Sequence, residues 1–388
     1  MAVKEIKPVT KTKYKEVKPK TYIDMPLFMI VIMLVGLGLI MVLSSSSPTA
    51  LATKNNSYFY FYRQLIAAVI GFAGMFAFSV IGVKWSQKIY WLVYLISVAI
   101  LFLVKIPGIG QSSGGAGRWV NIAGISFQPS ELSKIGLILA FAGYFSDERK
   151  NFKSIVFALF IPLVMLAIPL GILYKVENHL SAAMIVAVVL LVIVFMSGID
   201  MKYILGSLVL CVFGGGTIGY VFMKLKSDSF RIDRFEAWLH TEENATTTGY
   251  QTMQGLYAIG SGGLGGVGLG NSTQKYSYVP AAHNDFIFAI LAEELGFMGC
   301  ITVIALFILF AIRGYLISIR TKDKFSSLVA IGITTLILIQ AILNIAVVTN
   351  SMPNTGISLP FLSYGGTSLM VLVASVGILL NISRTTKD

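Results

Sequence analysis

Acidic and basic side chains stand beside long apolar runs at a few places in this chain. Asp285 follows His283 and Asn284 and opens a strongly apolar segment. Because ionised groups are costly in hydrocarbon, such residues are candidates for function. A carboxylate beside apolar surface has a raised proton affinity, which suits a general base, and it can also hold a divalent cation. Since an acid at a helix start can equally cap the first turn, the residue type alone leaves these roles open.

A second group of polar residues precedes another apolar run. Glu131 and Lys134 stand three residues apart, so on a helix they share a face and can pair. The pair is either structural or part of a polar cavity that positions a catalytic group or a phosphate. Arg118 could clamp a phosphate, and Trp119 could stack on a sugar or anchor at the membrane interface.

Further polar residues carry weaker indications. Glu293 lies nearer than Glu294 to the helical face of Asp285. Glu177 and His179 form a corner without another His or Cys at ligand spacing, so no zinc site is expected there. The run NTGISLPFLSYGGTS at 354–368 is rich in small polar residues, which favour either close helix packing or an unwound turn that faces a cavity.

The elements that must position these residues are membrane helices. Of the 388 residues, 56% are hydrophobic and only 12% are charged, which excludes an ordinary soluble domain. A mean hydropathy of +0.79 agrees. The apolar segments predict an all-α, polytopic membrane protein with about ten transmembrane helices. These helices are expected near 26–45, 63–83, 88–105, 131–146, 153–174, 180–198, 202–223, 285–312, 326–348 and 360–382.

The orientation of the bundle follows from its lysines and arginines. Lysines crowd residues 1–25, which we interpret as a basic cytoplasmic tail before a single membrane domain at 26–388. The formal net charge of +12 is thus read as a topology signal, and no nucleic-acid partner is expected. An even number of spans places both termini in the cytoplasm. The connections expected on the outer face are 46–62, 106–130, 175–179, 224–284 and 349–359.

The outer loop 224–284, between the predicted seventh and eighth helices, is longer than a simple connection requires. Its first part alternates charged and apolar residues and predicts an amphipathic helix on the membrane surface. Its second part is glycine-rich over 260–270, which lets the backbone approach a ligand or another segment closely. A nucleotide-binding loop is excluded, because neither a preceding strand nor a following phosphate-binding lysine is present.

Three blocks of this sequence strongly resemble the SEDS family of bacterial cell-wall glycosyltransferases. They are GAGRWVNIAGISFQPSELSK at 115–134, the run from YQTMQGLYAIG to FIFAILAEELG at 250–296, and NTGISLPFLSYGGTSLM at 354–370. The blocks occur in the family's order, and the resemblance covers nearly the whole chain. The wording FQPSELSK and ENHLSAA is more similar to the division and sporulation branch than to the elongation branch.

The resemblance implies polymerisation of lipid II into glycan strands on the outer face of the bacterial cytoplasmic membrane. It places Asp285 in the family's H-x-D-F-I-F motif as the catalytic base or a metal ligand. No tightly bound cofactor is expected, although a divalent cation, Mg or Mn, is left open. The expected partners are a class B penicillin-binding protein transpeptidase and other divisome proteins. The substrate-binding residues expected beside Asp285 are Arg118, Trp119, Glu131, Lys134, Lys275, His283, Ser363 and Thr367.

Within that set, different tasks are expected. Arg118, Lys134 and Lys275 would contact the diphosphate, Glu131 would orient Lys134, and Ser363 with Thr367 would line the cavity. Two other functions compete with polymerisation. A lipid II flippase would normally show internal repeats and charges at the membrane midplane, whereas here the ionisable residues gather at the outer boundary. A non-catalytic scaffold for the transpeptidase would leave Asp285 without a task.

Overall fold

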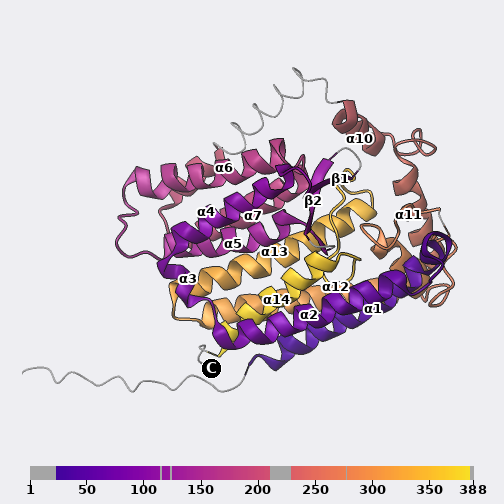
Figure 1. The fold of residues 1–388 in the computed structure, drawn as a ribbon, viewed down its shortest axis with the longest axis horizontal. Coiled ribbons are helices and arrows are strands. Elements are labelled where there is room, and N and C mark those ends of the chain that lie inside the picture. The colour runs from indigo at the N-terminus through magenta and orange to yellow at the C-terminus, as the bar shows by residue number, and fades with distance from the viewer. Residues whose placement is uncertain (1–22, 114–115, 123–124, 210–228, 277, 385–388) are drawn as a thin grey trace, which may run out of the picture.

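The structure is a computed structural model that describes residues 23–113, 116–122, 125–209, 229–276 and 278–384. Long helices run side by side through most of its length (Figure 1). The α-helices are α1 (Met25–Lys54), α2 (Phe59–Ile81), α3 (Lys84–Lys88), α4 (Tyr90–Leu101), α5 (Pro129–Phe145), α6 (Ile161–Lys175), α7 (Leu180–Met196), α8 (Met201–Val209), α10 (Ser229–Leu239), α11 (Tyr250–Gly262), α12 (Ile287–Arg320), α13 (Lys324–Val348) and α14 (Gly366–Ser383). A 3-10 turn, η1 (Phe102–Lys105), extends α4, and a π turn, η2 (Val156–Phe160), leads into α6.

The chain is therefore an all-α polytopic membrane protein. In its described part, 6 helices are long and apolar enough to cross a membrane, and the shorter apolar stretches 90–105 and 180–196 lie among them. Each predicted span contains a helix. The span 202–223 begins as α8 and then passes outside the described residues. The 388-residue chain's basic tail also lies outside them up to residue 22.

Helix α13 lies at the centre of the bundle, because 67% of the residues in its most apolar stretch are buried against other helices. Its neighbours include α12, α7 and α5. At the end where α13 begins, Asp323 caps it by accepting a hydrogen bond from Ser326 N at 3.1 Å. Asp24 caps α1 in the same way and pairs with Arg313 of α12 at 2.5 Å. These caps fix the helix ends opposite the candidate site.

Small residues let α2 and α14 pack closely. A Cβ atom at Gly377 would lie 2.2 Å from the backbone oxygen of Met75, and one at Gly71 would meet Val373 at 3.1 Å. Lipid tails are as apolar as the helix surfaces, so the hydrophobic effect does not drive two helices together in a membrane. Close backbone contact of this kind is what stabilises the pair. The pair α2–α14 thus forms one wall of the bundle, which lies along its lower edge in Figure 1.

Helix α12, which contains most of the span predicted at 285–312, is broken at Gly296. This residue has φ 66° and ψ −164°, outside the helical region. The glycine-rich loop fills the break, because Phe297 N donates to Gly263 O at 2.9 Å and Val267 N donates to Glu293 O at 2.9 Å. A Cβ atom at Gly266 would lie 2.1 Å from the backbone oxygen of Glu294. Close packing against α12 therefore explains this glycine.

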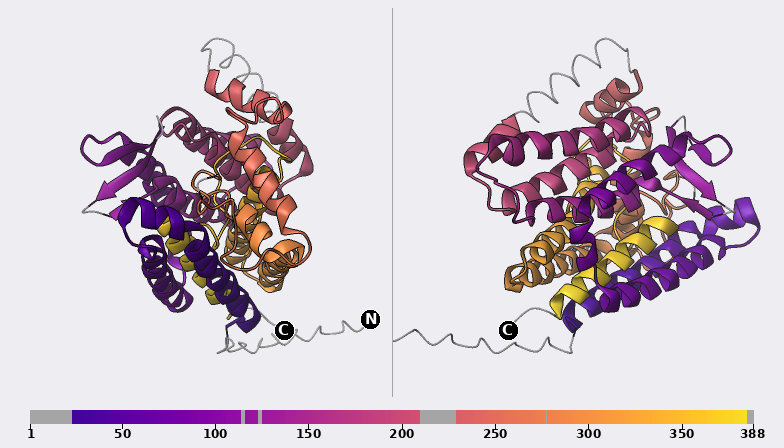
Figure 2. Two further views of the ribbon diagram at one scale, coloured as in Figure 1. Left: turned by 90° about the vertical axis from the view of Figure 1, so that its right-hand side faces the viewer. Right: turned by 60° about the vertical axis from the view of Figure 1, so that its left-hand side comes forward.

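The connection 106–130 contains a small antiparallel sheet that the sequence patterns did not predict. Its strands β1 (Gly110–Ser113), β2 (Ala116–Ile122) and β3 (Ile125–Phe127) pair in the order β1-β2-β3. The register places Gly110 opposite Val120 and Asn121 opposite Ser126. Figures 1 and 2 show the sheet at the same end of the bundle as α10 and α11.

Candidate active site

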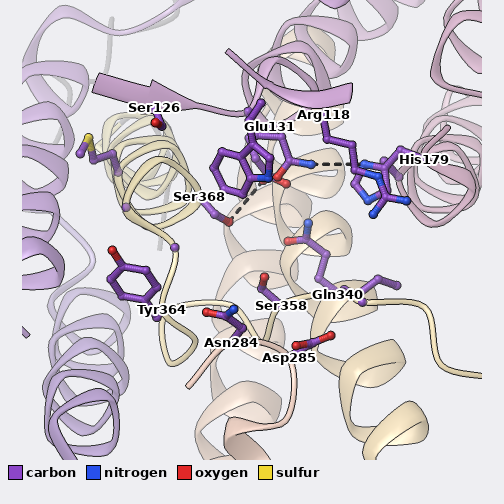
Figure 3. Close-up of a pocket in the computed structure, with 18 of the residues that line it drawn as sticks. Arg118, Ser126, Glu131, His179, Asn284, Asp285, Gln340, Ser358, Tyr364 and Ser368 are labelled. Carbon is purple, nitrogen blue, oxygen red and sulfur yellow. Dashed lines mark hydrogen bonds between the residues drawn. The ribbon is translucent and has the colours of Figure 1, made fainter. Parts of the chain in front are cut away.

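A cavity of about 780 Å³ opens at the end of the bundle that carries the sheet. Its walls come from α2, the strands β2 and β3, α5, α7, α10 and α13, and from irregular segments before α12 and α14. The wall residues near the mouth of the cavity lie in or beside the connections that the lysine and arginine distribution assigned to the outer face of the membrane. The charged residues that line the cavity are Arg63, Arg118, Glu131, Lys134, Arg234 and Asp285. Figure 3 labels Arg118, Glu131 and Asp285 among them.

Asp285 lies in the irregular segment just before α12, where it is partly buried. The side-chain Nδ2 of Asn344 donates a 2.7 Å hydrogen bond to the backbone oxygen of Asp285. Burial raises the pKa of the Asp285 carboxyl, and the positive charge of Arg234 lowers it in part. A carboxylate with increased proton affinity at a cavity wall has the properties that a general base needs.

The predicted pair of Glu131 and Lys134 forms, and it also lines the cavity. The Lys134 Nζ lies 2.8 Å from Glu131 Oε1, and the side chains are 3% and 9% exposed respectively. Ser368 of α14 donates to Glu131 Oε2 at 3.4 Å. Both interpretations of the pair thus hold together: it joins α5 to α14 and it places a cation at the wall.

The sheet holds Arg118 and Trp119 over the cavity from β2. Arg118 Nη2 donates to the backbone oxygen of Asn178 at 2.9 Å, which ties the strand to the corner before α7. In that corner, Gln128 lies 3.2 Å from His179 Nδ1. Burial lowers the pKa of His179 to about 3, so its ring is neutral at pH 7.

Beneath this corner Glu177 is completely buried, at 0% exposure, outside the cavity lining. Burial raises its pKa to about 7. Of the two titratable residues of this corner, His179 therefore lines the cavity and Glu177 does not.

Two cations of the lining were missed at the level of sequence. Arg63 of α2 stacks on Phe59, with its guanidinium carbon 4.6 Å from the ring centroid. Arg234 of α10 donates to the backbone oxygen of Asn354 at 3.2 Å. Arg63 is the first residue of the helix predicted at 63–83, and Arg234 lies in the predicted outer connection 224–284. A charge next to apolar residues at the outer boundary is a signal that could have identified both. The prediction of an amphipathic surface helix at this place had treated Arg234 only as part of its polar face.

Lys275, which was expected to contact the diphosphate, lies away from the cavity. It is 4% exposed and does not line the cavity. Its Nζ pairs with Glu294 Oε1 at 3.0 Å and donates to Ser44 Oγ at 3.3 Å. A buried ammonium requires a partner, and Glu294 supplies it. The second acid, Glu293, accepts hydrogen bonds from Ser272 and Thr273, so it too fixes the glycine-rich loop and does not face Asp285.

Three other expected binding residues also lie outside the lining. His283 is stacked between aromatic rings, 4.6 Å from Tyr60 and 5.6 Å from Tyr364 between ring centroids. Ser363 Oγ accepts a hydrogen bond from Leu359 N at 2.8 Å, which stabilises an unwound turn before α14. Thr367 is likewise absent from the wall, where its neighbour Ser368 contributes instead.

The segment 354–365 thus follows one of the two alternatives left open by its sequence. The predicted helix at 360–382 begins only at Gly366, and the backbone before it is irregular. Phe361 has φ 65°, and Gly356 has the same angle. Irregular backbone at membrane depth is tolerated where it lines a cavity, and Gly356, Ser358 and Tyr364 do line it.

The donor set for a metal ion is small. Among the described residues, no group of three or more His, Cys, Asp or Glu side chains could hold a metal. Asp285 offers one carboxylate, and Mg²⁺ typically binds through one or two carboxylates together with phosphate oxygens. The residues fit a cation that is completed by a phosphorylated ligand, and they do not fit a cage built by the protein alone.

The arrangement combines one acid of raised proton affinity with several cations at the same wall. Arg63, Arg118, Lys134 and Arg234 outnumber Glu131 and Asp285, so the cavity favours an anion. Guanidinium groups match phosphate oxygens in geometry. The site can therefore bind a phosphorylated compound and remove a proton from a hydroxyl next to it.

Comparison with known proteins gives consistent matches along almost the entire chain. A family model described as cell cycle protein, for FtsW, RodA and SpoVE, matches residues 25–388. The chain is 40% identical over 328 residues to a probable peptidoglycan glycosyltransferase FtsW of Trichlorobacter lovleyi, covering 84% of each chain. It is 38% identical to the stage V sporulation protein E of Bacillus subtilis, covering 83% of this chain and 86% of that protein.

A solved structure shows the same fold. It was reported under the description structural coordination of polymerization and crosslinking by a peptidoglycan synthase complex. The TM-score is 0.76 at 25% identity, and the match covers 94% of this chain and 98% of that one.

Proposed function

The chain belongs to the FtsW, RodA and SpoVE family, and on that premise we propose that its cavity is the active site of a peptidoglycan glycosyltransferase. The protein is a peptidoglycan glycosyltransferase of the division or sporulation type. Its substrate in this proposal is lipid II, a disaccharide-pentapeptide linked through a diphosphate to a long lipid. A multi-pass membrane protein with a polar cavity near one surface suits a substrate whose head group is polar and whose tail is apolar.

One observation carries the assignment of the site: Asp285 shares a single cavity with four cationic side chains. Transfer of a sugar from a lipid diphosphate requires both kinds of group. A base must take the proton of the attacking hydroxyl, and positive charge must stabilise the departing diphosphate. Neither flipping nor scaffolding requires a buried carboxylate of raised pKa in the same cavity.

The proposed step is a substitution at the anomeric carbon of one sugar. A hydroxyl oxygen of the other sugar forms the new C–O bond while its proton passes to the Asp285 carboxylate. The bond between the anomeric carbon and the phosphate oxygen breaks, and its electron pair stays on the diphosphate. Arg63, Arg118, Lys134 and Arg234 would stabilise the charge that develops on that leaving group.

Other parts of the proposal extend beyond the cavity. In the alternative role, Asp285 would be a metal ligand: together with the substrate diphosphate it would hold a divalent cation, Mg or Mn, and the cation would neutralise charge on the leaving group. The cavity would face the outside of the cytoplasmic membrane, with both chain termini in the cytoplasm, as the lysine distribution predicts. A class B penicillin-binding protein and other divisome proteins are the proposed partners, in line with the peptidoglycan synthase complex that has the same fold.

The test is glycan-strand synthesis from labelled lipid II by the purified protein with a class B transpeptidase. Asp285→Asn keeps the size of the side chain and removes the base, so we expect at least a roughly hundredfold loss of rate. Asp147→Asn is the matched control, because Asp147 lies beyond the opposite end of α5 from the cavity. This control should retain the wild-type rate.

Folding and substrate binding are checked separately, by thermal unfolding and by stabilisation with lipid II. A folded Asp285→Asn variant that polymerises at the wild-type rate would refute the role of Asp285. If the wild-type protein made no polymer with its partner but moved lipid II across vesicle membranes, the flippase function would replace the proposal. Binding of the transpeptidase without either activity would instead indicate a scaffold.

A further inference from the structure

Gln340 of α13 presents an unsatisfied polar group to the cavity. Its side chain lines the cavity but is only 4% exposed. The carboxamide oxygen is buried and has no hydrogen-bond partner among the described residues. In Figure 3 this carboxamide points into the cavity, with Asp285 and Ser358 on one side of it and Glu131 on the other.

An acceptor in such a position is costly to the free protein. Leaving a buried polar atom without a partner costs roughly 1–3 kcal/mol. Buried polar atoms are therefore nearly always paired, and one that is directed into a binding cavity indicates a missing donor. The Lys134 ammonium does not supply this donor, because it is engaged with Glu131.

The position of Gln340 relative to Asp285 is set by the helix turn that follows it. Asn344 stands four residues later on the same face of α13. Its Nδ2 donates to the backbone oxygen of Asp285 at 2.7 Å and to that of Ile357 at 2.7 Å. The turn that presents the Gln340 carboxamide thus also holds the segment with the proposed base. A substrate group bound at Gln340 must lie next to the group that reacts at Asp285.

The chemistry of a carboxamide narrows the type of group. It is neutral, so it adds nothing to the attraction of a diphosphate, for which the arginines are better suited. It offers a donor and an acceptor side by side. The buried oxygen needs one donor. The N–H of a substrate amide supplies it without an acceptor on the same atom, whereas a hydroxyl oxygen brings lone pairs that also need partners in this buried position. The sugars of peptidoglycan carry such an amide as an acetamido group on the ring.

We propose that Gln340 binds the acetamido group of the sugar that reacts at Asp285, through the N–H of that group and the buried Gln340 carboxamide oxygen. This contact makes Gln340 a specificity-determining residue that selects acetylated amino sugars. The inference deepens the proposed glycosyltransferase function and depends on it.

The experiment compares two substrates and three proteins, each in complex with the class B transpeptidase. The substrates are lipid II and an analogue in which an oxygen replaces the N–H of the acetamido group, so that its carbonyl and methyl remain and the donor is lost. The proteins are the wild type, Gln340→Leu and Thr334→Val. Thr334 is a matched control, because it is on the same helix at 0% exposure and outside the cavity lining, and its hydroxyl also has no partner in the described part of the chain.

For Gln340→Leu we expect kcat/KM for lipid II to fall roughly 10- to 100-fold, the loss of a hydrogen bond to a substrate amide. For the analogue with oxygen in place of the N–H, the same variant should lose less than about threefold, because the donor of the contact is absent there. The melting temperature without substrate should not fall, since an unpaired buried atom is removed. Thr334→Val should match the wild type on both substrates.

Each other result decides against the inference in a recognisable way. Equal losses on both substrates would overturn the assignment to the acetamido group, and an unchanged kcat/KM for lipid II would overturn any substrate contact. In both cases the wild type still polymerises, so the proposed function stands. If the wild type and Thr334→Val made no polymer at all, the proposed function would fail, and the inference with it.

Discussion

Replacement of Asn344 by leucine is the most informative single perturbation of the site. The Asn344 side chain is 1% exposed and donates two 2.7 Å hydrogen bonds, to the backbone oxygens of Asp285 and Ile357. These carbonyls belong to the two irregular segments that precede α12 and α14. Leucine has a similar size and no donor, so Asn344→Leu removes both bonds without opening a large space.

The expected magnitude follows from the two bonds. Hydrogen bonds between helices in a membrane are worth about 0.6 kcal/mol on average and at most about 1.7 kcal/mol each. Two of them give a loss of about 1–3 kcal/mol in the free energy of unfolding, or a few degrees in Tm. The rate should suffer more, because a base displaced by about 1 Å can cost a hundredfold in rate. We expect kcat to fall roughly 10- to 100-fold.

The assay is polymerisation of lipid II with the transpeptidase present, together with thermal unfolding in the same detergent. Asn381→Leu of α14 is the matched control. Asn381 Nδ2 also donates to a backbone oxygen, that of Ser79 at 2.8 Å, but at the end of α14 remote from the cavity. This control should lose stability by a comparable amount per bond while retaining the wild-type kcat.

The comparison separates positioning from stability. If Asn344→Leu kept the wild-type kcat, the two carbonyl contacts would not be needed to hold Asp285, and the reasoning would be refuted. Equal effects of Asn344→Leu and Asn381→Leu on both kcat and Tm would reduce the role of Asn344 to general stability.

Three further predictions concern other groups around the cavity. In Arg234→Gln the pKa of Asp285 should rise further, because burial already raises it and the opposing positive charge is lost. Since the base must be ionised to act, the acidic limb of the pH–rate profile should move to higher pH. Gly356→Ala should lower the polymerisation rate several-fold, since its φ of 65° is strained for alanine by about 1–2 kcal/mol and its new methyl group would lie 3.6 Å from Asp285 Oδ2. Lys275→Met should lower Tm sharply, because Glu294 is left buried without its partner at a cost of about 3–5 kcal/mol, and Lys275→Met with Glu294→Gln should recover most of that loss with lipid II kinetics near wild type.

The membrane helices were predictable because each must cover its backbone with apolar side chains over a nearly fixed length. The helix at 326–348 coincides with α13, Lys324–Val348, almost to the residue. The pair Glu131–Lys134 was predictable for a similarly local reason, since its spacing on one helix brings the charges together. Local periodicity therefore gives the spans and any contact made within one turn.

Contacts between distant segments were not predictable in this way. Lys275 pairs with Glu294, in the helix that its own loop packs against, and both are absent from the lining. The sequence around Lys275 gives no local indication that its side chain is only 4% exposed and packs against α1 and α12. The same limit concealed Arg234, whose place at the cavity depends on how α10 lies across segment 354–365. The resemblance to a family ordered the motifs but did not decide which side chains face inward.

The two irregular segments at the cavity share a physical device. Their backbone groups lie at membrane depth without helical partners, so they must be satisfied by something else. Neutral carboxamides do this: Asn344 serves the segment of Asp285, and Gln64 Nε2 donates to Ser363 O at 3.0 Å while its Oε1 accepts from Gly365 N at 3.2 Å. A carboxamide satisfies backbone groups without adding a charge to the cavity. Loss of Asn344 or Gln64 should therefore lower stability and rate together, whereas loss of Arg63 should weaken substrate binding with little change in the fold.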